Sequence, residues 1–192
     1  MDVIEAIRKR RTVRFFQPGG VNKEQVLELL DLARVAPSAA NRQPMEYVVV
    51  MDQEVRDALF DKLAFGAYVK PKRVPPPEKR PAAYIVALWD RDRSSFEQWE
   101  AGAALQNIML GAVDAGLATC WLGGIDRDGI RSLLGVPDRF DIVAVLALGR
   151  PGEEPVLEEK DDDVKYWLDK EDVLHVPKRS LSSIVRFDRF TP

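Results

Sequence analysis

Apolar residues recur every three to four positions in five segments of the chain and fill short unbroken runs in four others. The first pattern is typical of helices with one buried face, and the second of buried strands. We therefore expect helices at residues 3–10, 22–36, 54–65, 96–117 and 126–135, and strands at 47–51, 83–89, 118–122 and 142–148. Capping signals support two helix starts, since Asp2 precedes Glu5, and Asn22 precedes Gln25, by three positions.

The order of these elements predicts an α+β fold in a single domain. Helices and strands alternate, but the connections are irregular and the most apolar helix lies mid-chain, which disfavours a doubly wound nucleotide-binding fold. Residues 71–81 contain so many prolines that an exposed loop is expected. Helix 96–117 is apolar on more of its circumference than one buried face requires, so we expect a second subunit to cover it.

The last segment, residues 152–192, differs in composition from the core at residues 1–151. It is polar and acidic, with few apolar residues, so it is expected either to be disordered or to wrap around a partner. Its short apolar groups favour wrapping. A partner subunit would then bury the side chains of Tyr166, Trp167, Leu181 and Ile184.

Composition excludes several classes of protein. With 192 residues, 46% of them apolar and 31% charged, the chain is typical of one soluble domain. No apolar run is long enough for a membrane span, and Asp2 and Glu5 lie where a signal peptide carries positive charge. A cytoplasmic location without a membrane partner is therefore expected. The net charge of −3 argues against a nucleic-acid partner.

The single cysteine and the single histidine are not expected to carry chemistry. Cys120 lies in an apolar strand, where a thiol usually packs, and His175 lies in the polar tail, where we expect it to be exposed. One cysteine and one histidine do not complete a zinc site, so no metal is expected.

Two basic segments suit an anionic ligand. In RKRRTVRFF (residues 8–16), Arg10, Arg11 and Thr12 combine guanidinium groups with a hydroxyl, which suits a phosphate monoester, and Arg14 can reach another part of the same ligand. VPKRSLSSIVRF (176–187) supplies a second basic pair. Taken singly, the first segment is also consistent with a solvated basic run and the second with surface salt bridges.

Two further segments suit a planar ligand. In APSAANRQP (residues 36–44), polar side chains lie between a helix end and a strand, and two prolines stiffen the loop. Gly123 and Gly124 follow a strand and leave room for the backbone to approach a ring. Taken singly, these segments are also consistent with an ordinary connection and an ordinary turn.

In this order, the four segments resemble the nitroreductase family of FMN-dependent oxidoreductases. RRTVRFF is similar to the family's R-[RHS]-[ST]-x-[RK] opening, APSAANRQP to its P-S-x-x-N-x-Q-P loop, and PKRSLSSIV to its closing basic motif. Residues 101–124 are similar to its long interface helix and the strand and bend under the flavin. The resemblance covers nearly the whole chain. It implies a three-layer α+β fold, with a mainly antiparallel central sheet flanked by helices, in an intertwined homodimer whose C-terminal extension wraps the partner.

The resemblance also implies which residues hold FMN. Those at the phosphate would be Arg10, Arg11, Thr12, Lys178 and Arg179. Arg14 would lie nearer the ribityl chain and the N1/O2 edge, where positive charge stabilises the anionic reduced flavin. The residues lining the isoalloxazine, partly from the other subunit, would be Pro37, Ser38, Ala39, Asn41 and Gln43, with Leu122, Gly123 and Gly124 approaching its N5 side. FMN is expected rather than FAD, because no dinucleotide fingerprint is present.

The chain departs from the family pattern around the substrate pocket. Many larger members have an acidic residue at the position of Gly123, a Trp at that of Met45, and an insertion with Asn and Lys flavin contacts near residues 68–80. Here this region is short and rich in proline, and the candidate substitutes are Tyr68, Lys70, Lys72 and Arg73. The identity of the acceptor therefore does not follow from the resemblance.

The implied activity is a ping-pong cycle in which NAD(P)H reduces FMN at N5 and leaves, and a small acceptor then takes the hydride. The acceptor would be a nitroaromatic, a quinone or a free flavin. Because the cofactor carries the chemistry, no side chain is assigned a catalytic role. Other readings stay open: reductive dehalogenation, flavin-ring cleavage or dehydrogenation within the family, a non-catalytic FMN-binding protein, or a nucleic-acid binder.

Overall fold

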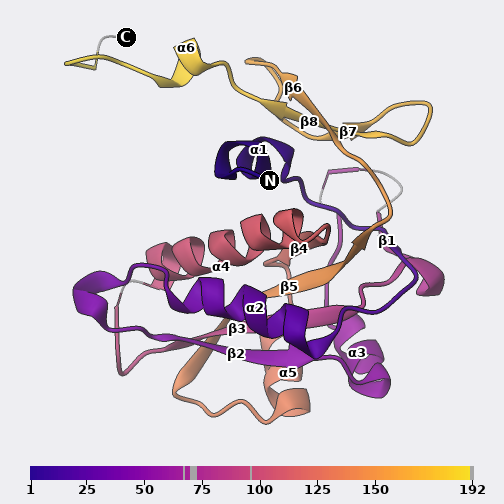
Figure 1. Cartoon of the computed structure of the whole chain (residues 1–192), viewed down its shortest axis with the longest axis vertical. Coiled ribbons are helices and arrows are strands. Elements are labelled where there is room, and N and C mark those ends of the chain that lie inside the picture. Colours follow the sequence, from indigo (N-terminus) through magenta and orange to yellow (C-terminus); the bar gives the residue numbers. More distant parts are fainter. Residues whose placement is uncertain (67, 70–72, 96, 191–192) are drawn as a thin grey trace.

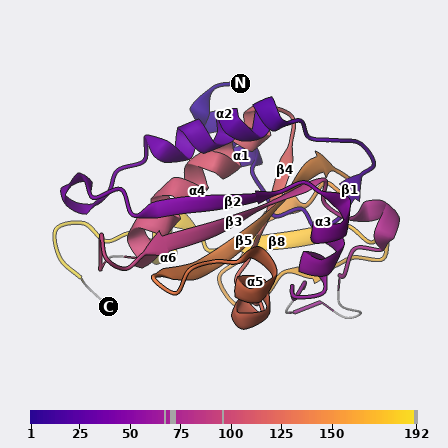
Figure 2. The same cartoon turned by 90° about the horizontal axis from the view of Figure 1, so that it is seen from below.

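A mainly antiparallel sheet forms the central layer of the computed structural model, which describes residues 1–66, 68–69, 73–95 and 97–190 (Figures 1 and 2). The sheet runs in the order β1-β5-β3-β2, and β4 also pairs with β5. All of these pairs are antiparallel. The strands are β1 (Phe16–Gln17), β2 (Met45–Val50), β3 (Ala83–Asp90), β4 (Ala118–Leu122) and β5 (Phe140–Pro151).

Helices cover both faces of this sheet and complete three layers. Figure 2 shows α2 and α4 on one face and α3 and α5 on the other. Buried side chains of each pair of helices join the apolar cluster on their face. The helices of this part are α1 (Val3–Lys9), α2 (Lys23–Arg34), α3 (Gln53–Phe60), α4 (Glu97–Asp114) and α5 (Arg127–Leu134), with short 3-10 turns η1 (Ala39–Asn41) and η2 (Pro77–Lys79). No helix in the described ranges is long and apolar enough to cross a membrane. The α+β class and the flanked antiparallel sheet predicted from the sequence are confirmed.

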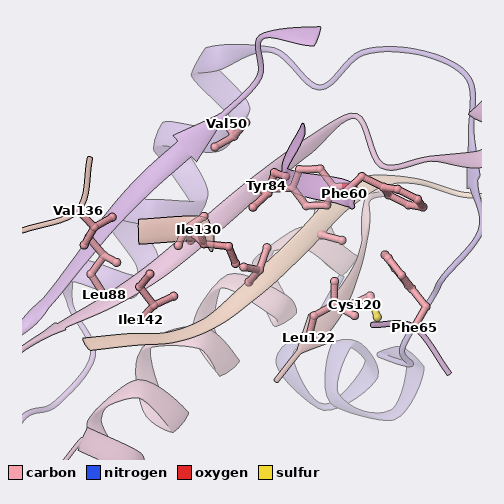
Figure 3. Close-up of a cluster of buried hydrophobic side chains, with 14 of the residues drawn as sticks. Val50, Phe60, Phe65, Tyr84, Leu88, Cys120, Leu122, Ile130, Val136 and Ile142 are labelled. Atoms are coloured by element: carbon pink, nitrogen blue, oxygen red, sulfur yellow. The ribbon is translucent and has the colours of Figure 1, made fainter. Parts of the chain in front are cut away.

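The central strand β3 shows why both faces of the sheet are apolar. Tyr84, labelled in Figure 3, and Val86 belong to the apolar cluster on the α3/α5 side, whereas Ile85 and Ala87 belong to the cluster on the α2/α4 side. The register with β5 shifts between Ala87 and Leu88, so one extra residue of β5 is accommodated there. A continuous apolar run is what a strand buried on both faces requires.

Local signals place most helix ends where the sequence predicts them. The side chain of Asn22 accepts from the Gln25 N–H at 2.8 Å and the Gln25 side chain accepts from the Asn22 N–H at 3.1 Å, which is a complete capping box. At the end of α5, Gly135 adopts a left-handed φ of 65°. The helix predicted at residues 54–65 is too long, because α3 ends at Phe60.

The proline-rich loop is less exposed than the sequence suggests. Residues 77–79 form η2, and the side chains of Arg73 and Pro75 are buried. Tyr68, another candidate flavin contact, is 62% exposed. Lys70 and Lys72, the remaining candidates, lie outside the described residues.

The C-terminal extension contains short strands that sequence periodicity does not indicate. Its small sheet has the order β6-β8-β7, with a parallel β6–β8 pair and an antiparallel β7–β8 pair. In Figure 1 this sheet stands apart from the main sheet, above α1. The elements are β6 (Val156–Glu159), β7 (Trp167–Leu168), β8 (Leu174–Lys178) and α6 (Leu181–Ile184).

His175 belongs to this small sheet, and the prediction that it is solvent-exposed is wrong. Its side chain is only 17% exposed, because the ring stacks on Trp167 and its two nitrogens face Glu158 at 2.6 Å and Asp169 at 3.2 Å. The hydrogen bond to Asp169, together with the carboxylate of Glu158, raises the pKa of His175 above its ordinary value.

Candidate functional site

The basic turn, Arg10 to Arg14, lies against strand β4. The N–H of Val13 donates to the carbonyl of Thr119 at 3.0 Å, and Thr12 forms a parallel bridge with Thr119. Since β4 continues to Leu122 and then to Gly123, the turn and the glycine pair are attached to the same strand. Two of the four ligand-binding segments predicted from the sequence are therefore fixed on one structural support.

Two guanidinium groups of this turn are desolvated without a neutralising partner. Arg10 and Arg11 are half-buried, and burial lowers the pKa of both, with repulsion from Arg10 adding to the effect on Arg11. Among the described residues, no acidic side chain forms an ion pair with either. In the part of the chain that the structure describes, the buried Nε atoms of Arg11 and Arg14 also find no hydrogen-bond partner. A bound anion with several acceptor oxygens would satisfy these groups.

A cavity of about 510 Å³ adjoins the basic turn. Basic side chains of Arg8, Lys9 and Arg11 meet there with the acidic side chains of Glu153 and Glu154. The remaining lining is mostly apolar and comes from the ends of α4, β5 and β6. Arg10 and Thr12 do not line this cavity. The residues predicted to bind the phosphate are therefore not all gathered around one cavity in the single chain.

Arg14 is held by groups of its own chain. It is 9% exposed, and its guanidinium lies over the ring of Tyr166 in the C-terminal extension, 4.9 Å from the centroid. Tyr166 also packs edge-on against Tyr68, with 5.3 Å between ring centroids. The sequence predicts that a partner subunit buries Tyr166, but its ring already packs within its own chain, whereas Trp167, Leu181 and Ile184 stay substantially exposed.

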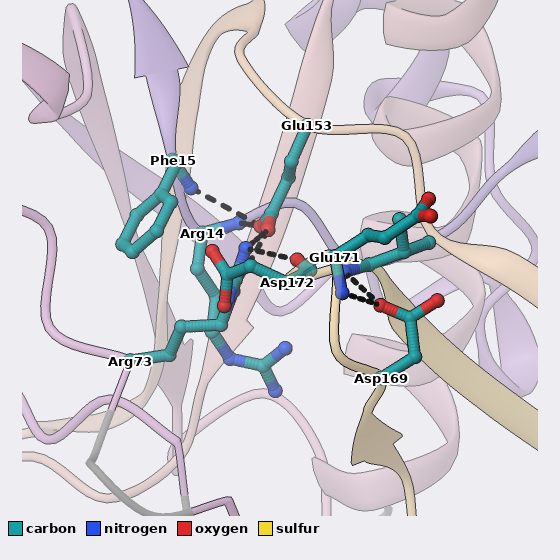
Figure 4. Close-up of polar contacts among 8 residues, drawn as sticks. Arg14, Phe15, Arg73, Glu153, Asp169, Glu171 and Asp172 are labelled. Carbon is teal, nitrogen blue, oxygen red and sulfur yellow. Dashed lines mark hydrogen bonds and ion pairs between the residues drawn. The ribbon is translucent and has the colours of Figure 1, made fainter.

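Glu153 connects the basic turn to the buried Arg73. One carboxylate oxygen accepts from the backbone N–H groups of Arg14 and Phe15, and the other accepts from Arg73 Nε at 2.9 Å and Nη2 at 2.6 Å (Figure 4). The side chains are 5% and 8% exposed for Arg73 and Glu153 respectively. Arg73 Nη1 pairs with Asp172 Oδ1 at 2.7 Å, and its guanidinium lies 4.3 Å from the Phe15 ring centroid.

This network gives Arg73 a role that the sequence analysis did not foresee. Burial disfavours its charge, but the hydrogen bonds that Arg73 donates to Glu153 and Asp172 outweigh burial, so the pKa of Arg73 is raised. Because its guanidinium is already satisfied by two carboxylates, it is not available as a substitute flavin contact in this arrangement. The sequence motifs do not indicate Glu153 either; its only signal in the sequence is an acidic pair, Glu153 and Glu154, soon after a strongly apolar strand.

The loop at residues 37–43 is fixed in a strained shape. Three of its non-glycine residues have left-handed φ values, namely Ala40 (51°), Asn41 (54°) and Gln43 (49°). Ser38 Oγ accepts from the Gln43 N–H at 3.0 Å, and Glu100 of α4 accepts from the Ala39 N–H at 2.9 Å. Such strain persists only where surrounding bonds over-determine the backbone, and it is common at ligand clamps.

A second cavity, of about 330 Å³, lies behind this loop. Ser38 and Gln43 line it together with Glu100 and Tyr47. Burial raises the pKa of Tyr47 to about 12, and neither the Tyr47 hydroxyl nor Glu100 Oε2 has a hydrogen-bond partner. No residue lines both this cavity and the one beside the basic turn. Pro37, Asn41 and Gln43 are exposed.

The glycine pair after β4 offers backbone rather than side chains. The side chain of Leu122 is buried in the core, 4% exposed, while Gly123 and Gly124 are exposed. Neither glycine has a positive φ, so conformational freedom does not explain them. A Cβ on Gly124 would lie 3.3 Å from that of Ala64, whereas one on Gly123 would meet nothing within 4 Å.

Lys178 and Arg179 are exposed at the end of β8 and in the turn after it. Arg179 donates to the Ser183 carbonyl at 2.9 Å. Neither residue lines the cavity beside the basic turn. Within one chain, Lys178 and Arg179 therefore do not join the basic turn at its cavity.

Comparisons with known proteins identify the chain. The model of the nitroreductase family matches residues 7–150, which include the basic turn, the strained loop and the glycine pair. The chain belongs to the nitroreductase family. It is therefore an oxidoreductase enzyme, and the family and enzyme class inferred from the four motifs are confirmed.

Individual nitroreductases and their relatives align over most of the chain. It is 33% identical to a protein of Methanothermobacter thermautotrophicus described as an NADH dehydrogenase/NAD(P)H nitroreductase, over 88% of each chain. A protein of the same description from Archaeoglobus fulgidus is 29% identical, over 84% of this chain and 92% of its own. A solved structure described as a nitroreductase in complex with FMN, from Desulfovibrio desulfuricans, has a TM-score of 0.70 and 26% identity, over 100% of this chain and 99% of that one.

In the described part of the chain, neither Cys120 nor a group of metal ligands is a candidate for the chemistry of the site. Cys120 is 2% exposed, and burial raises the pKa of its thiol to about 11, so it is protonated at neutral pH. This agrees with a packing role. In the part of the chain that the structure describes, no group of His, Cys, Asp or Glu residues is arranged to hold a metal ion.

Proposed function

We propose that this nitroreductase-family chain binds FMN between two subunits and transfers hydride from NAD(P)H to a small acceptor. The observation that carries the proposal is the pair of desolvated guanidinium groups, Arg10 and Arg11, in the turn beside β4, neither of which forms an ion pair with a carboxylate of the described residues. A phosphate monoester matches their charge and their donors. The FMN found in the similar Desulfovibrio structure and the NAD(P)H in the names of the similar archaeal proteins support the same assignment.

The residues present fit FMN in three respects. The unsatisfied Nε atoms of Arg11 and Arg14 can donate to phosphate or to the polar edge of the ring. The exposed backbone of Gly123 and Gly124 leaves space for a planar group. The strained loop presents Ser38, Asn41 and Gln43 in a fixed arrangement.

When bound, FMN would supply the centre that accepts and donates hydride, so this chain needs no nucleophile of its own. Its residues bind and orient. Arg10, Arg11 and Thr12, with Lys178 and Arg179, would hold the phosphate, and the buried charge of Arg14 would favour the more negative state of the cofactor. Pro37, Ser38, Ala39, Asn41 and Gln43 would cover the ring, and Leu122, Gly123 and Gly124 would approach it through backbone groups.

A homodimer reconciles the separation of these groups. The strained loop and the basic turn border different cavities of one chain, and Lys178 lies at neither. Apolar side chains on α1 and α6 are uncovered, including Ile4 (55% exposed), Ile7 (48%), Leu181 (70%) and Ile184 (57%). A second copy would bury them and could bring the loop of one subunit to the basic turn of the other. The extension at residues 152–192 would then wrap the partner.

We propose a chemical class of acceptor and an order of binding rather than one named acceptor. A nitroaromatic, a quinone or a flavin would bind after NAD(P)H leaves, in a ping-pong sequence, because both must approach the same ring. A specialised family activity, such as reductive dehalogenation, flavin-ring cleavage or dehydrogenation, is the alternative enzyme function, and a non-catalytic FMN-binding protein is the alternative outside catalysis.

The colour of the purified protein and its response to NAD(P)H without oxygen test the function. We expect a yellow protein that is bleached by NAD(P)H and regains colour with an acceptor. A yellow protein that NAD(P)H does not bleach would support the binding protein instead. Mass spectrometry of the released cofactor checks the flavin, and finding FAD would overturn the assignment. A steady-state screen of acceptors with the same holoenzyme then separates the enzyme activities.

A further inference from the structure

Glu153 occupies an unusual position for an acidic residue beside a basic turn. Its carboxylate does not neutralise the guanidinium groups of Arg10, Arg11 or Arg14. One oxygen accepts from two successive backbone N–H groups, of Arg14 and Phe15, and the other is held by Arg73 (Figure 4). We propose that Glu153 is a positioning residue, which fixes the backbone of the basic turn so that the Arg14 side chain points toward the flavin.

The geometry around Glu153 fixes the turn from three parts of the chain. Arg73, from the proline-rich loop, binds Glu153 with two nitrogens and covers the Phe15 ring at 4.3 Å. Asp172, from the extension, holds the outer side of Arg73 at 2.7 Å. Asp169 in turn fixes the backbone beside Asp172, since its carboxylate accepts from the N–H groups of Glu171 and Val173, both at 2.9 Å (Figure 4).

Because Arg73 and Glu153 are both buried, removing either one would be costly. Arg73 and Glu153 are 5% and 8% exposed, so neither charge is solvated if the other is removed. The two adjacent, partly buried N–H groups of Arg14 and Phe15 would also lose their acceptor, and such donors are rarely left unpaired. Arg14 has a second restraint in the Tyr166 ring. The backbone bond to Glu153 and the ring of Tyr166 together define the direction of its side chain.

The inference rests on the proposed FMN function, and two double variants separate positioning from simple charge pairing. In R73M/E153Q both charges are removed, but the amide oxygen of Gln still accepts from the two N–H groups. In R73M/E153L both charges and the acceptor are removed. Neither variant leaves an unpaired buried charge. Glu28→Gln is the control, because Glu28 is an exposed carboxylate of α2 that lines neither the cavity beside the basic turn nor the one behind the loop.

FMN affinity and reduction potential of the holoprotein are the readouts. We expect R73M/E153Q and E28Q to bind FMN within about threefold of the unchanged chain, and R73M/E153L to bind at least tenfold more weakly. The bound flavin of R73M/E153L should also have a more negative reduction potential, because the positive charge of Arg14 no longer faces it. A merely structural role would not move the potential of the FMN that is still bound.

Equal FMN affinity and equal potential in the two double variants would overturn the inference. If R73M/E153L does not fold, hydrogen–deuterium exchange of the backbone amides in the unchanged protein tests the inference instead. The N–H groups of Arg14 and Phe15 should then be strongly protected, and rapid exchange at both would contradict the inference. If the unchanged chain binds no FMN, the proposed function itself fails, and that outcome is distinct from either result with the variants.

Discussion

The guanidinium of Arg14 lies over the ring of Tyr166, 4.9 Å from its centroid, although 152 positions separate the two residues in the sequence. The first part of the C-terminal extension, at Tyr166, therefore contacts the basic turn of its own chain. We therefore propose two roles for the extension. Its first part orients Arg14, and its last part, with Leu181 and Ile184 exposed, is available to a partner.

Replacing the Tyr166 ring should weaken FMN binding modestly. A cation–π contact of this kind is worth about 0.5–2 kcal/mol, so Tyr166→Leu should raise the FMN dissociation constant by about 2- to 30-fold. Tyr166→Phe keeps the ring and should stay within about twofold. Flavin fluorescence quenching measures both constants. If the Phe and Leu variants weaken binding equally, the ring does not act through Arg14.

Replacing Arg10 and Arg11 together should have a larger effect. A hydrogen bond to a charged group is worth about 1.5–3 kcal/mol, so R10A/R11A should weaken FMN binding by two or more orders of magnitude. Lys23→Ala with Lys165→Ala removes the same amount of charge from exposed positions elsewhere and is the control. Equal binding by both double variants would place the phosphate site elsewhere.

Cys120→Ser should leave turnover within a few-fold of the unchanged enzyme. The thiol is buried and its pKa is about 11, so it is not a thiolate at neutral pH. A buried hydroxyl in its place is expected to lower the melting temperature rather than the rate per folded molecule. Loss of hydride transfer at full FMN occupancy would show that the cysteine takes part in the chemistry.

The pairing of His175 should make the extension pH-dependent. Its pKa is raised in the folded chain, first by Asp169 and then by Glu158. A raised folded-state pKa means that the stabilisation is complete below the unfolded value of about 6.5 and is lost as pH rises through the folded-state pKa. The carboxylate of Asp169 has a lowered pKa, through the Val173 N–H and then His175, so its own contribution is lost only in acid.

Since the chain has one histidine, proton NMR can follow this titration without ambiguity. We expect a pKa above 6.5 in the unchanged protein and a lower one in Glu158→Gln. His175→Gln should lose the fall in melting temperature on going from mildly acid to mildly alkaline pH. A histidine pKa at or below 6.5 would contradict the pairing seen here.

Four of the five strands of the main sheet, and its helices, could be predicted from the sequence because their signals are local, whereas the two-residue strand β1 was not predicted. Strand β4 has the predicted bounds, and α2 starts at its capping box and α5 ends at Gly135 as expected. The extension could not be predicted in the same way. Strand β7 has two residues, too few for a periodic pattern, and β6 pairs with a strand whose partner residues lie about 19 positions away.

The candidate site was predictable to the extent that it follows contiguous motifs. The basic turn, the loop after Pro37 and the glycine pair were found from residue types and order. The Arg73–Glu153 pair was not, because 80 positions separate its members and nothing in a charged residue's neighbours indicates its partner. The same holds for Glu100, which supports the loop through the Ala39 N–H from a helix 61 positions away.

The central claim is that FMN is bound between a basic turn of one subunit and a strained loop of the other. It is tested most directly by the FMN content of a mixed dimer of R10A/R11A with N41D/Q43E, purified through two different tags.

Each variant alone should bind little FMN, since the first lacks the phosphate ligands and the second places carboxylates at the ring. Sedimentation should give a mass of about twice 21.7 kDa for the pair. We predict one FMN per mixed dimer, because one of its two sites takes an intact turn from one subunit and an intact loop from the other. A mixed dimer without FMN, formed from subunits whose unchanged parent binds it, would contradict the account.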